Sequence, residues 1–352
     1  MTVDRLVVSS SSRIDLNFFG DVSLSALRDE HTGFAPAGFA VGPLGFQVTG
    51  HLSDHLVGRT EYVLAFEDGH TVADVERVYL EYRSEHWALA AGRTHAELGY
   101  WNNAFHHGRW LQLTINRPYV LRFEDEGGFL PVHQVGANLA YGPKRGDGGV
   151  EFAVGVANGH GPVLEEIQTN FDNNWSKSVL VRIGAVGIGS PSLRFGVNFG
   201  VDGIEPADAT VRPFLADTRI VEIITGAYIA SRSDPIQLFA EVYNVLHRGG
   251  DRAWGTTDGF VTFGYRVGAF IPFGQLEIRH GDGLGDPFYR PNPALESETV
   301  SPTNFVSGIA GMRYEINPWS ALKLELEAHK VQTADSSYRN DYRAELNWSF
   351  GR

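Results

Sequence analysis

The chain has 352 residues, a formal net charge of −13 and no cysteine. Without cysteine it forms no disulfide, no Cys-ligated zinc or iron–sulfur site and no haem linkage through Cys-x-x-Cys-His. The acidic balance argues against nucleic acid as a partner. No apolar run reaches the roughly 18 residues that a spanning helix needs, so an α-helical membrane protein is not expected.

Residues 1–12 are predicted to form an N-terminal extension ahead of the first strand. The opening stretch from Met1 to Arg5 lacks the basic-then-apolar pattern of a secretory signal. We expect that a signal was removed, because the strands that follow need a bilayer to face.

Most of the remaining chain alternates apolar and polar residues, which is the side-chain period of a β-strand. Segment 322–327 is Leu-Lys-Leu-Glu-Leu-Glu, and segment 342–350 is Tyr-Arg-Ala-Glu-Leu-Asn-Trp-Ser-Phe. The sixteen predicted strands are 13–27, 38–53, 55–68, 73–84, 87–97, 132–142, 149–159, 175–186, 191–203, 217–231, 236–248, 257–271, 274–283, 304–316, 320–333 and 338–351. The phase of the alternation is ambiguous in 87–97, 217–231 and 304–316.

The predicted connections differ in length between the two ends of the strands. Short turns follow the even-numbered strands, at 53–55, 84–86, 143–148, 187–190, 233–235, 272–273 and 317–319. Long connections follow odd-numbered strands, at 28–37, 98–131, 160–174, 204–216, 249–256 and 284–303, whereas 69–72 and 334–337 are short. This asymmetry is typical of a membrane barrel whose short rim is periplasmic.

We therefore predict an all-β fold in which residues 13–351 form one transmembrane antiparallel up-and-down β-barrel of about 16 strands, with short periplasmic turns and long outer loops. Soluble all-β folds are the alternative. Strands in a sandwich or jelly roll usually have about 5–6 residues, whereas most of these are about twice as long. A propeller would repeat a blade of about 40–50 residues, and no such repeat is seen.

With these features the chain resembles the bacterial outer-membrane porins of the sixteen-stranded general or substrate-selective type. The resemblance rests on the strand number, the loop lengths, the long connection 98–131 and the aromatic-rich last strand. The phrase Val154-Gly-Val-Ala-Asn-Gly159 is also similar to phosphate-selective porin-like strands. One departure is that Gly351 and Arg352 follow the aromatic Phe350, on which such chains usually end.

The resemblance implies a barrel in outer-membrane lipid that works as a passive diffusion channel for small hydrophilic solutes or ions, without enzymatic activity or a cofactor. It also implies that loop 98–131 folds into the lumen, and that the protein assembles as a homotrimer. The loop residues expected at the constriction are His106, His107, Arg109, Arg117, Arg122, Glu124 and Asp125.

The strand phases place a second set of charged residues on the lumen wall. The wall residues expected to line the pore are Arg59, Glu61, Arg77, Glu81, Arg83, Arg194, Glu241, Arg266, Glu277, Arg279, Glu325 and Glu327. Separation of the two signs across the lumen would create a transverse field. Cross-strand pairing, for example of Glu61 with Arg77, would instead neutralise the wall. The sequence leaves both arrangements open.

Two short segments suggest metal ligands, and we predict no metal site at either. His106 and His107 are adjacent, so on a strand they would point apart. Segment 281–286, Gly-Asp-Gly-Leu-Gly-Asp, has closely spaced carboxylates but no complete calcium-ligand set.

Two other functions compete with diffusion. The barrel is a candidate sheath for a haem-protein partner in a porin–cytochrome electron conduit, although it carries no haem-attachment cysteines of its own. It is also a candidate outer-membrane hydrolase, although no convincing nucleophile and base pair is seen in the sequence.

Overall fold

The structure is a computed structural model that describes residues 13–29, 33–34, 37–67, 70–105, 108–122, 128–144, 146–161, 174–206, 218–289, 303–333 and 336–352. Within these ranges the chain is nearly all strand. Its helical segments are short: α1 (Trp101–Phe105), η1 (Tyr119–Leu121) and η4 (Gly283–Gly285). No helix in the described ranges is long and apolar enough to cross a membrane.

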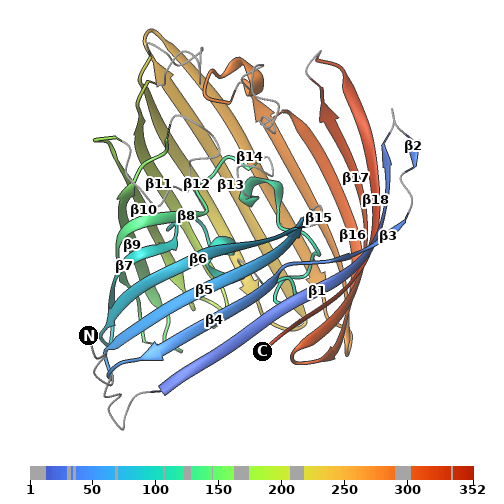
Figure 1. The fold of residues 1–352 in the computed structure, drawn as a ribbon, viewed down its shortest axis with the longest axis horizontal. Helices are drawn as coiled ribbons and strands as arrows, with labels where there is room; N and C mark the ends of the chain where they lie inside the picture. Colours follow the sequence, from blue (N-terminus) through green and yellow to red (C-terminus); the bar gives the residue numbers. More distant parts are fainter. Residues whose placement is uncertain are drawn as a thin grey trace.

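The strands run antiparallel to their neighbours in chain order (Figure 1). Their bounds are β1 (Arg13–Asp29), β2 (Gly33–Phe34), β3 (Gly38–Val41), β4 (Leu44–His51), β5 (Leu56–Glu67), β6 (His70–Arg83), β7 (Trp87–His95), β8 (His133–Tyr141), β9 (Gly149–Asn158), β10 (Lys177–Val186), β11 (Arg194–Ile204), β12 (Ile220–Arg232), β13 (Ile236–Gly249), β14 (Arg252–Tyr265), β15 (Phe270–Gly281), β16 (Phe305–Asn317), β17 (Ser320–Gln332) and β18 (Tyr338–Gly351).

The sheet closes on itself because β1 pairs with β18, from Phe19 opposite Gly351 to Asp29 opposite Asp341. The segments β2, β3 and β4 all pair with β1, so they are successive pieces of one barrel strand. Eighteen segments therefore make sixteen barrel strands, and the predicted barrel is confirmed. A closed barrel leaves no sheet edge and pairs the backbone polar groups, which is what a bilayer requires.

The alternation of side chains separates an apolar outer face from a polar inner face. Phe195, Phe263, Leu324 and Trp348 point outward and are 41%, 47%, 50% and 50% exposed, although they are large and apolar. Glu325, next to Leu324 in the chain, points inward and is 1% exposed. Oily side chains thus surround the barrel, and ionic ones line its interior.

Aromatic side chains gather on the outer face near the short turns. Trp87 and Tyr141 have ring centroids 4.9 Å apart, and Tyr141 stacks on Phe152 at 5.6 Å. On the other side of the barrel Phe270 and Tyr314 are 4.8 Å apart. Such rings mark the boundary between lipid and water in membrane barrels.

The predicted boundary between β14 and β15 is wrong. A strand was expected over 257–271 with a turn at 272–273, but β14 ends at Tyr265 and the turn lies at 266–269. Val267 and Phe270 close this turn by a backbone bridge, and Gly268 has a φ of +62°. Because Val267 continues the apolar alternation of the strand, the pattern alone does not locate the turn.

The long connection predicted at 249–256 is also wrong. β13 and β14 extend to Gly249 and Arg252, and only Gly250 and Asp251 join them. Gly250 has a φ of +57°, a conformation that suits a tight turn. Short connections therefore occur at both rims.

Residues 96–132 join β7 to β8, and their described parts, 96–105, 108–122 and 128–132, lie inside the barrel (Figure 1). We call this segment the lumen loop. It contains α1 and η1, and its residues contact wall strands far away in the sequence.

Candidate functional site

The first attachment of the lumen loop to the wall is made by Glu241 of β13. The backbone N–H groups of Tyr100 and Trp101 donate to Glu241 Oε1 at 2.8 and 2.7 Å, and the Tyr243 hydroxyl donates to Oε2 at 2.7 Å. Next to them Gly99 N–H donates to Asn198 Oδ1 at 3.0 Å. Gly99 has a φ of +63°, and a Cβ there would collide with the carboxylate of Glu241. The position at which the loop enters the lumen therefore requires a glycine.

A second attachment is made at η1 by carboxylates of β15 and β17. Tyr119 N–H donates to Glu277 Oε2 at 2.6 Å, and Ile115 N–H donates to Glu325 Oε2 at 2.8 Å. The Tyr119 hydroxyl donates to Glu327 Oε1 at 3.3 Å. Its ring lies under the Arg122 guanidinium, with 3.5 Å between the guanidinium carbon and the ring centroid.

The environment of Tyr119 disfavours its ionisation. Burial raises the pKa of Tyr119 to about 12, because a phenolate would lose its hydration there. The hydroxyl is therefore a proton donor at all physiological pH values.

Cationic wall residues hold the carbonyl groups of the same loop. Lys323 Nζ, fully buried on β17, donates to Thr114 O at 2.7 Å and also to Arg109 O. Arg313 donates to Gln112 O at 2.8 Å. Arg109 in turn donates to Asp21 of β1 at 2.8 Å. Both cationic and anionic side chains of the wall therefore form hydrogen bonds with the backbone of the lumen loop.

An apolar core fills the space between the lumen loop and strands β10 to β16. From the loop it contains Leu98, Trp101, Phe105, Leu113, Val120, Leu121, Phe129 and Leu130. From the wall it contains Leu180, Ile224, Phe239, Phe260, Ile271, Phe273 and Ile309, among others. Phe105 meets Phe239 edge to face at 5.1 Å. Packed apolar side chains therefore occupy this part of the lumen.

Polar space remains on the opposite side, between the loop and the wall. One cavity of about 230 Å³ is lined by β5 to β8 and by Asn103 of the loop. A second cavity of about 240 Å³ adjoins it and reaches β1, β4 and Trp110. Arg77, His95 and Asn103 line both cavities. We call the two together the polar passage.

The charges along the polar passage are mostly paired. Arg77 Nε donates to Glu61 Oε2 at 2.6 Å, and Arg83 forms an ion pair with Glu81. Arg59 lies in the same cavity, with its guanidinium carbon 5.7 Å from the centroid of the Tyr79 ring. No carboxylate of the described residues forms an ion pair with Arg59, and its Nε is buried without a hydrogen-bond partner.

The comparisons with known proteins agree with this architecture. The outer-membrane channel DcaP of Acinetobacter baumannii has a TM-score of 0.60 to this chain, with 13% identity and coverage of 97% of each chain. OmpF of Salmonella typhi, solved with daunomycin, has a TM-score of 0.55 and 13% identity, over 96% of this chain and 97% of that one. The fold is that of the outer-membrane porins.

The outer-membrane protein OmpT of Vibrio cholerae shares the fold as well. Its TM-score is 0.60 at 10% identity, over 97% of this chain and 99% of that one. No protein-family model matches the sequence, and no curated protein sequence matches it either. At such identities the likeness concerns the porin fold alone.

Within this barrel the wall residues singled out from the sequence fall into three groups. Those that border the polar passage are Arg59, Glu61, Arg77, Glu81 and Arg83. Those buried against the lumen loop are Glu241, Glu277, Arg279, Glu325 and Glu327. Arg194 pairs with Glu151 at 2.6 Å, and Arg266 sits in a short turn, paired with Asp234 and Glu315.

The structure describes three of the seven residues singled out in the loop, namely Arg109, Arg117 and Arg122. Arg109 and Arg122 make the contacts given above, and Arg117 lies over the Trp101 ring at 5.8 Å. His106, His107, Glu124 and Asp125 lie outside the described residues. The alternative of cross-strand neutralisation holds at Glu61 and Arg77, which face each other in the register of β5 and β6.

The carboxylates of segment 281–286 do not converge on a common centre. Asp282 accepts the Gly255 N–H at 2.6 Å, whereas Asp286 lies 2.6 Å from His247 Nδ1. In the described part of the chain no group of three or more His, Asp or Glu side chains is arranged to hold a metal ion.

Several polar residues of the passage were not singled out from the sequence. Thr94, His95, Glu97, Asn103 and Asn138 all line the first cavity. Thr94, His95 and Glu97 fall in 87–97, where the alternation is ambiguous, and Gly92 inside β7 (Trp87–His95) has a φ of +133°. Asn103 and Asn138 are uncharged, so the sequence pattern did not single them out, and only the structure shows that they line the passage.

Proposed function

We propose that this chain is an outer-membrane porin, a passive channel through which small hydrophilic solutes or ions diffuse without covalent chemistry. The observation that carries the proposal is the polar passage, which runs inside a lipid-facing barrel between the lumen loop and β5 to β8. The lumen loop is the constriction, because its apolar residues pack against one half of the wall, whereas the two polar cavities lie toward the other half.

The volume of the passage limits the size of the solute that can enter it. Cavities of about 230 and 240 Å³ hold small hydrated molecules, not folded proteins. The same observation bears on the electron-conduit alternative, because a sheath must admit a haem protein to its lumen. Here the chain's own loop occupies that space, so we prefer the diffusion channel. We propose no hydrolase activity.

Conductance of purified barrels in planar bilayers tests this function. We expect stepwise, ohmic channel openings in salt solution. Folded protein that inserts into the bilayer without conducting would contradict the proposal.

A cysteine experiment tests the route, because the natural chain has no cysteine. Asn103→Cys places a thiol on both cavities of the passage, whereas Ser53→Cys places one in an exposed turn. A charged thiol-directed reagent should reduce the conductance of the first variant and leave the second unchanged. Equal effects would show that ions take another path.

The resemblance to sixteen-stranded porins also leads us to propose a homotrimer. Native mass spectrometry in detergent distinguishes a trimer from a monomer directly. A monomeric mass under conditions that preserve the barrel would exclude the trimer.

A further inference from the structure

The connection that follows β15 folds back over the lumen side of the wall, and we call its described part, residues 282–289, the outer segment. At its start Asp282 N–H donates to Gly255 O of β14 at 2.9 Å, and Gly255 N–H donates to Asp282 Oδ2 at 2.6 Å. At its end Phe288 and Tyr289 are 0% and 1% exposed. Both belong to the apolar core that also contains the lumen loop. The outer segment is therefore packed into the barrel.

His247 of β13 joins the end of the outer segment to the wall. Its Nδ1 lies 2.6 Å from Asp286 Oδ2, and its Nε2 lies 2.9 Å from Oε2 of Glu222, which is directly opposite it on β12. All three side chains are buried. Asp286 Oδ1 also accepts the Phe288 N–H at 3.0 Å, so the same carboxylate fixes the turn before Phe288. We call the three residues Glu222, His247 and Asp286 the His247 bridge.

Aromatic rings extend this contact to the lumen loop. The His247 ring meets Phe288 edge to face at 5.1 Å and lies 5.2 Å from the Tyr289 ring. Tyr289 in turn meets Phe129 of the lumen loop edge to face at 6.2 Å. The outer segment therefore covers the returning part of the lumen loop, and His247 lies beneath that cover.

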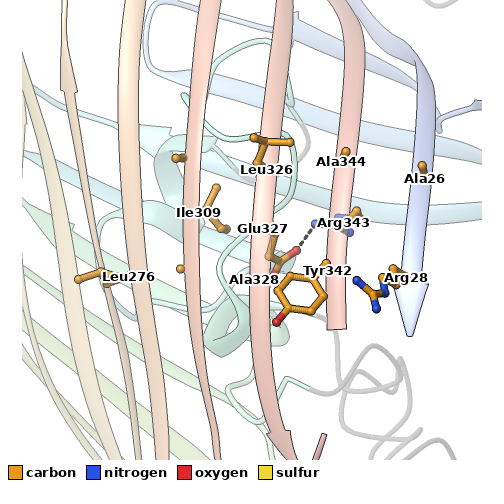
Figure 2. Close-up of a pocket in the computed structure, with 12 residues that line it drawn as sticks. Ala26, Arg28, Leu276, Ile309, Leu326, Glu327, Ala328, Tyr342, Arg343 and Ala344 are labelled. Carbon is orange, nitrogen blue, oxygen red and sulfur yellow. Dashed lines mark ion pairs between the residues drawn. The ribbon is translucent and has the colours of Figure 1, made fainter. Parts of the chain in front are cut away.

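The His247 bridge differs from the ion pairs that join neighbouring strands. Figure 2 shows one of those pairs, between Arg343 of β18 and Glu327 of β17, whose nitrogen and oxygen are 2.7 Å apart. Strands β17 and β18 are also joined by a backbone ladder, so they do not depend on that pair. The outer segment follows the end of β15 and has no strand pairing. Its position therefore depends on side-chain contacts such as that of Asp286 with His247.

The geometry of the bridge requires a proton on each nitrogen of the His247 ring. Both nitrogens face carboxylate oxygens, which accept hydrogen bonds and, when ionised, donate none. A neutral imidazole has one N–H and would turn a lone pair toward the other carboxylate. An imidazolium donates to both, and such charge-assisted hydrogen bonds are stronger than neutral ones. The bridge is therefore complete only when His247 is a cation.

Two further buried groups adjoin the bridge. His160, which follows β9, places its Nδ1 3.7 Å from Glu222 Oε1, and its backbone N–H donates to Asp202 of β11 at 2.5 Å. In the described part of the chain, three buried carboxylates (Asp202, Glu222 and Asp286) thus share two imidazoles. Loss of a proton from His247 leaves this cluster with more uncompensated negative charge, which is costly in a buried place.

The other charged groups on the elements around His247 are directed elsewhere. On β14 and β15, Asp258 and Arg279 form a buried ion pair with each other at 2.6 Å. Three side chains at the rim are exposed to solvent, namely Arg248, Asp251 and Arg252. Asp282, also exposed, accepts the Gly255 N–H as described above. The protonation of His247 is thus coupled chiefly to the carboxylates of its own cluster.

We propose that His247, as an imidazolium, holds the outer segment over the lumen loop, and that this hold weakens when the pH rises. Loss of one ring proton removes one of the two hydrogen bonds of the bridge, so Asp286 and the two aromatic residues after it separate more readily from the wall. The hold is complete at lower pH and is lost as the pH passes the point at which His247 becomes neutral. This inference does not depend on the proposed channel function, because it concerns local opening of the folded barrel.

Nitrogen-15 NMR of the detergent-solubilised full chain, labelled at histidine, tests the protonation of His247. The ring signals of His247 are identified by their loss in His247→Gln. We expect one ring nitrogen to lose its proton in a single step as the pH is raised from about 6, near the ordinary pKa of histidine. A ring that is already neutral at the start of the titration would overturn the proposal.

Chymotrypsin tests the opening, because it cleaves after aromatic residues and Phe288 and Tyr289 are accessible only when the outer segment separates from the wall. Cleavage at these bonds is followed by fragment mass and divided by the rate for an unfolded peptide of the same sequence at each pH. This ratio should rise about tenfold across the NMR step, the effect of losing one charge-assisted hydrogen bond. His247→Gln should be cleaved rapidly at every pH, because one amide cannot donate to both carboxylates in this geometry.

His280→Gln is the matched control, because it removes an exposed imidazole from the outer face of β15. It should keep the natural pH step in cleavage. If His247→Gln does not fold, Asp286→Asn serves instead, since it removes one charge from the bridge and keeps the size of the side chain. It should make the step smaller.

Two cleavage results would overturn the proposal. One is a cleavage ratio that does not change with pH in the natural protein. The other is a pH step that persists unchanged in His247→Gln or, where that variant does not fold, in Asp286→Asn. Absence of conductance in bilayers would contradict the channel function and leave both measurements of the bridge valid.

Discussion

Glu241 on the barrel wall accepts the backbone N–H of Trp101, 140 residues earlier in the chain, at 2.7 Å. A buried carboxylate thus binds the start of a helix that belongs to the lumen loop. The same principle recurs at Glu277 and Glu325, so the loop is held by wall charges that bind its backbone. These wall residues are structural, although they face the lumen of the barrel.

Glu241→Ala should destabilise the protein strongly. The change leaves two buried N–H groups without an acceptor, and we expect a loss of about 2–4 kcal/mol in the free energy of unfolding. Urea titration of tryptophan fluorescence measures it. Glu81→Ala is the control, because among the described residues Glu81 forms its ion pair with the half-exposed Arg83, and the change should cost less than about 1 kcal/mol. Equal losses would contradict the anchoring role.

Gly99→Ala should loosen the lumen loop. Alanine is strained at a φ of +63°, and its Cβ would displace the Glu241 carboxylate. We expect faster protease cleavage within 98–131 and a larger, noisier conductance. Gly58→Ala is the matched control, since the nearest atom to its new Cβ is 4.0 Å away. A Gly99 variant whose conductance and current noise equal those of the natural protein would show that the loop tolerates the displaced Glu241 carboxylate.

Arg59→Gln should change ion selectivity. Arg59 contributes a positive charge to the polar passage that no described carboxylate neutralises by pairing, so it favours anions. The reversal potential in a salt gradient should move toward cation preference in the variant. Lys177→Gln, a charge removed from the outer face, should leave the potential unchanged. An unaltered potential in the Arg59 variant would place the selectivity elsewhere.

Tyr119 should give a stability change in strongly alkaline solution. Its pKa is about 12 in the folded protein against an ordinary value of 10.0, so the unfolded chain loses this proton first. The contribution of the protonated Tyr119 to the free energy of unfolding is complete below pH 10 and is lost as the pH rises from 10 to 12. Tyr119→Phe should show a smaller loss over that window in urea titrations. Identical pH profiles would mean that Tyr119 ionises freely.

The sequence by itself determined the barrel and the two faces of its wall. A strand has a side-chain period of two, so once Leu324 faces lipid, Glu325 must face the lumen. The same rule separated Trp348 from Asn347 in the last strand. The rule did not locate the turn between β14 and β15, because Val267 continues the apolar alternation into that turn. Gly268, with its positive φ, marks the turn instead.

Only the tertiary structure decided what the inward charges do. Glu61 and Glu241 follow the same alternation in their strands, yet one borders the polar passage and the other holds Trp101. The difference arises because the lumen loop packs its apolar residues against β10 to β16, on the side away from β5. Such contacts join residues more than a hundred positions apart, and local periodicity carries no information about them.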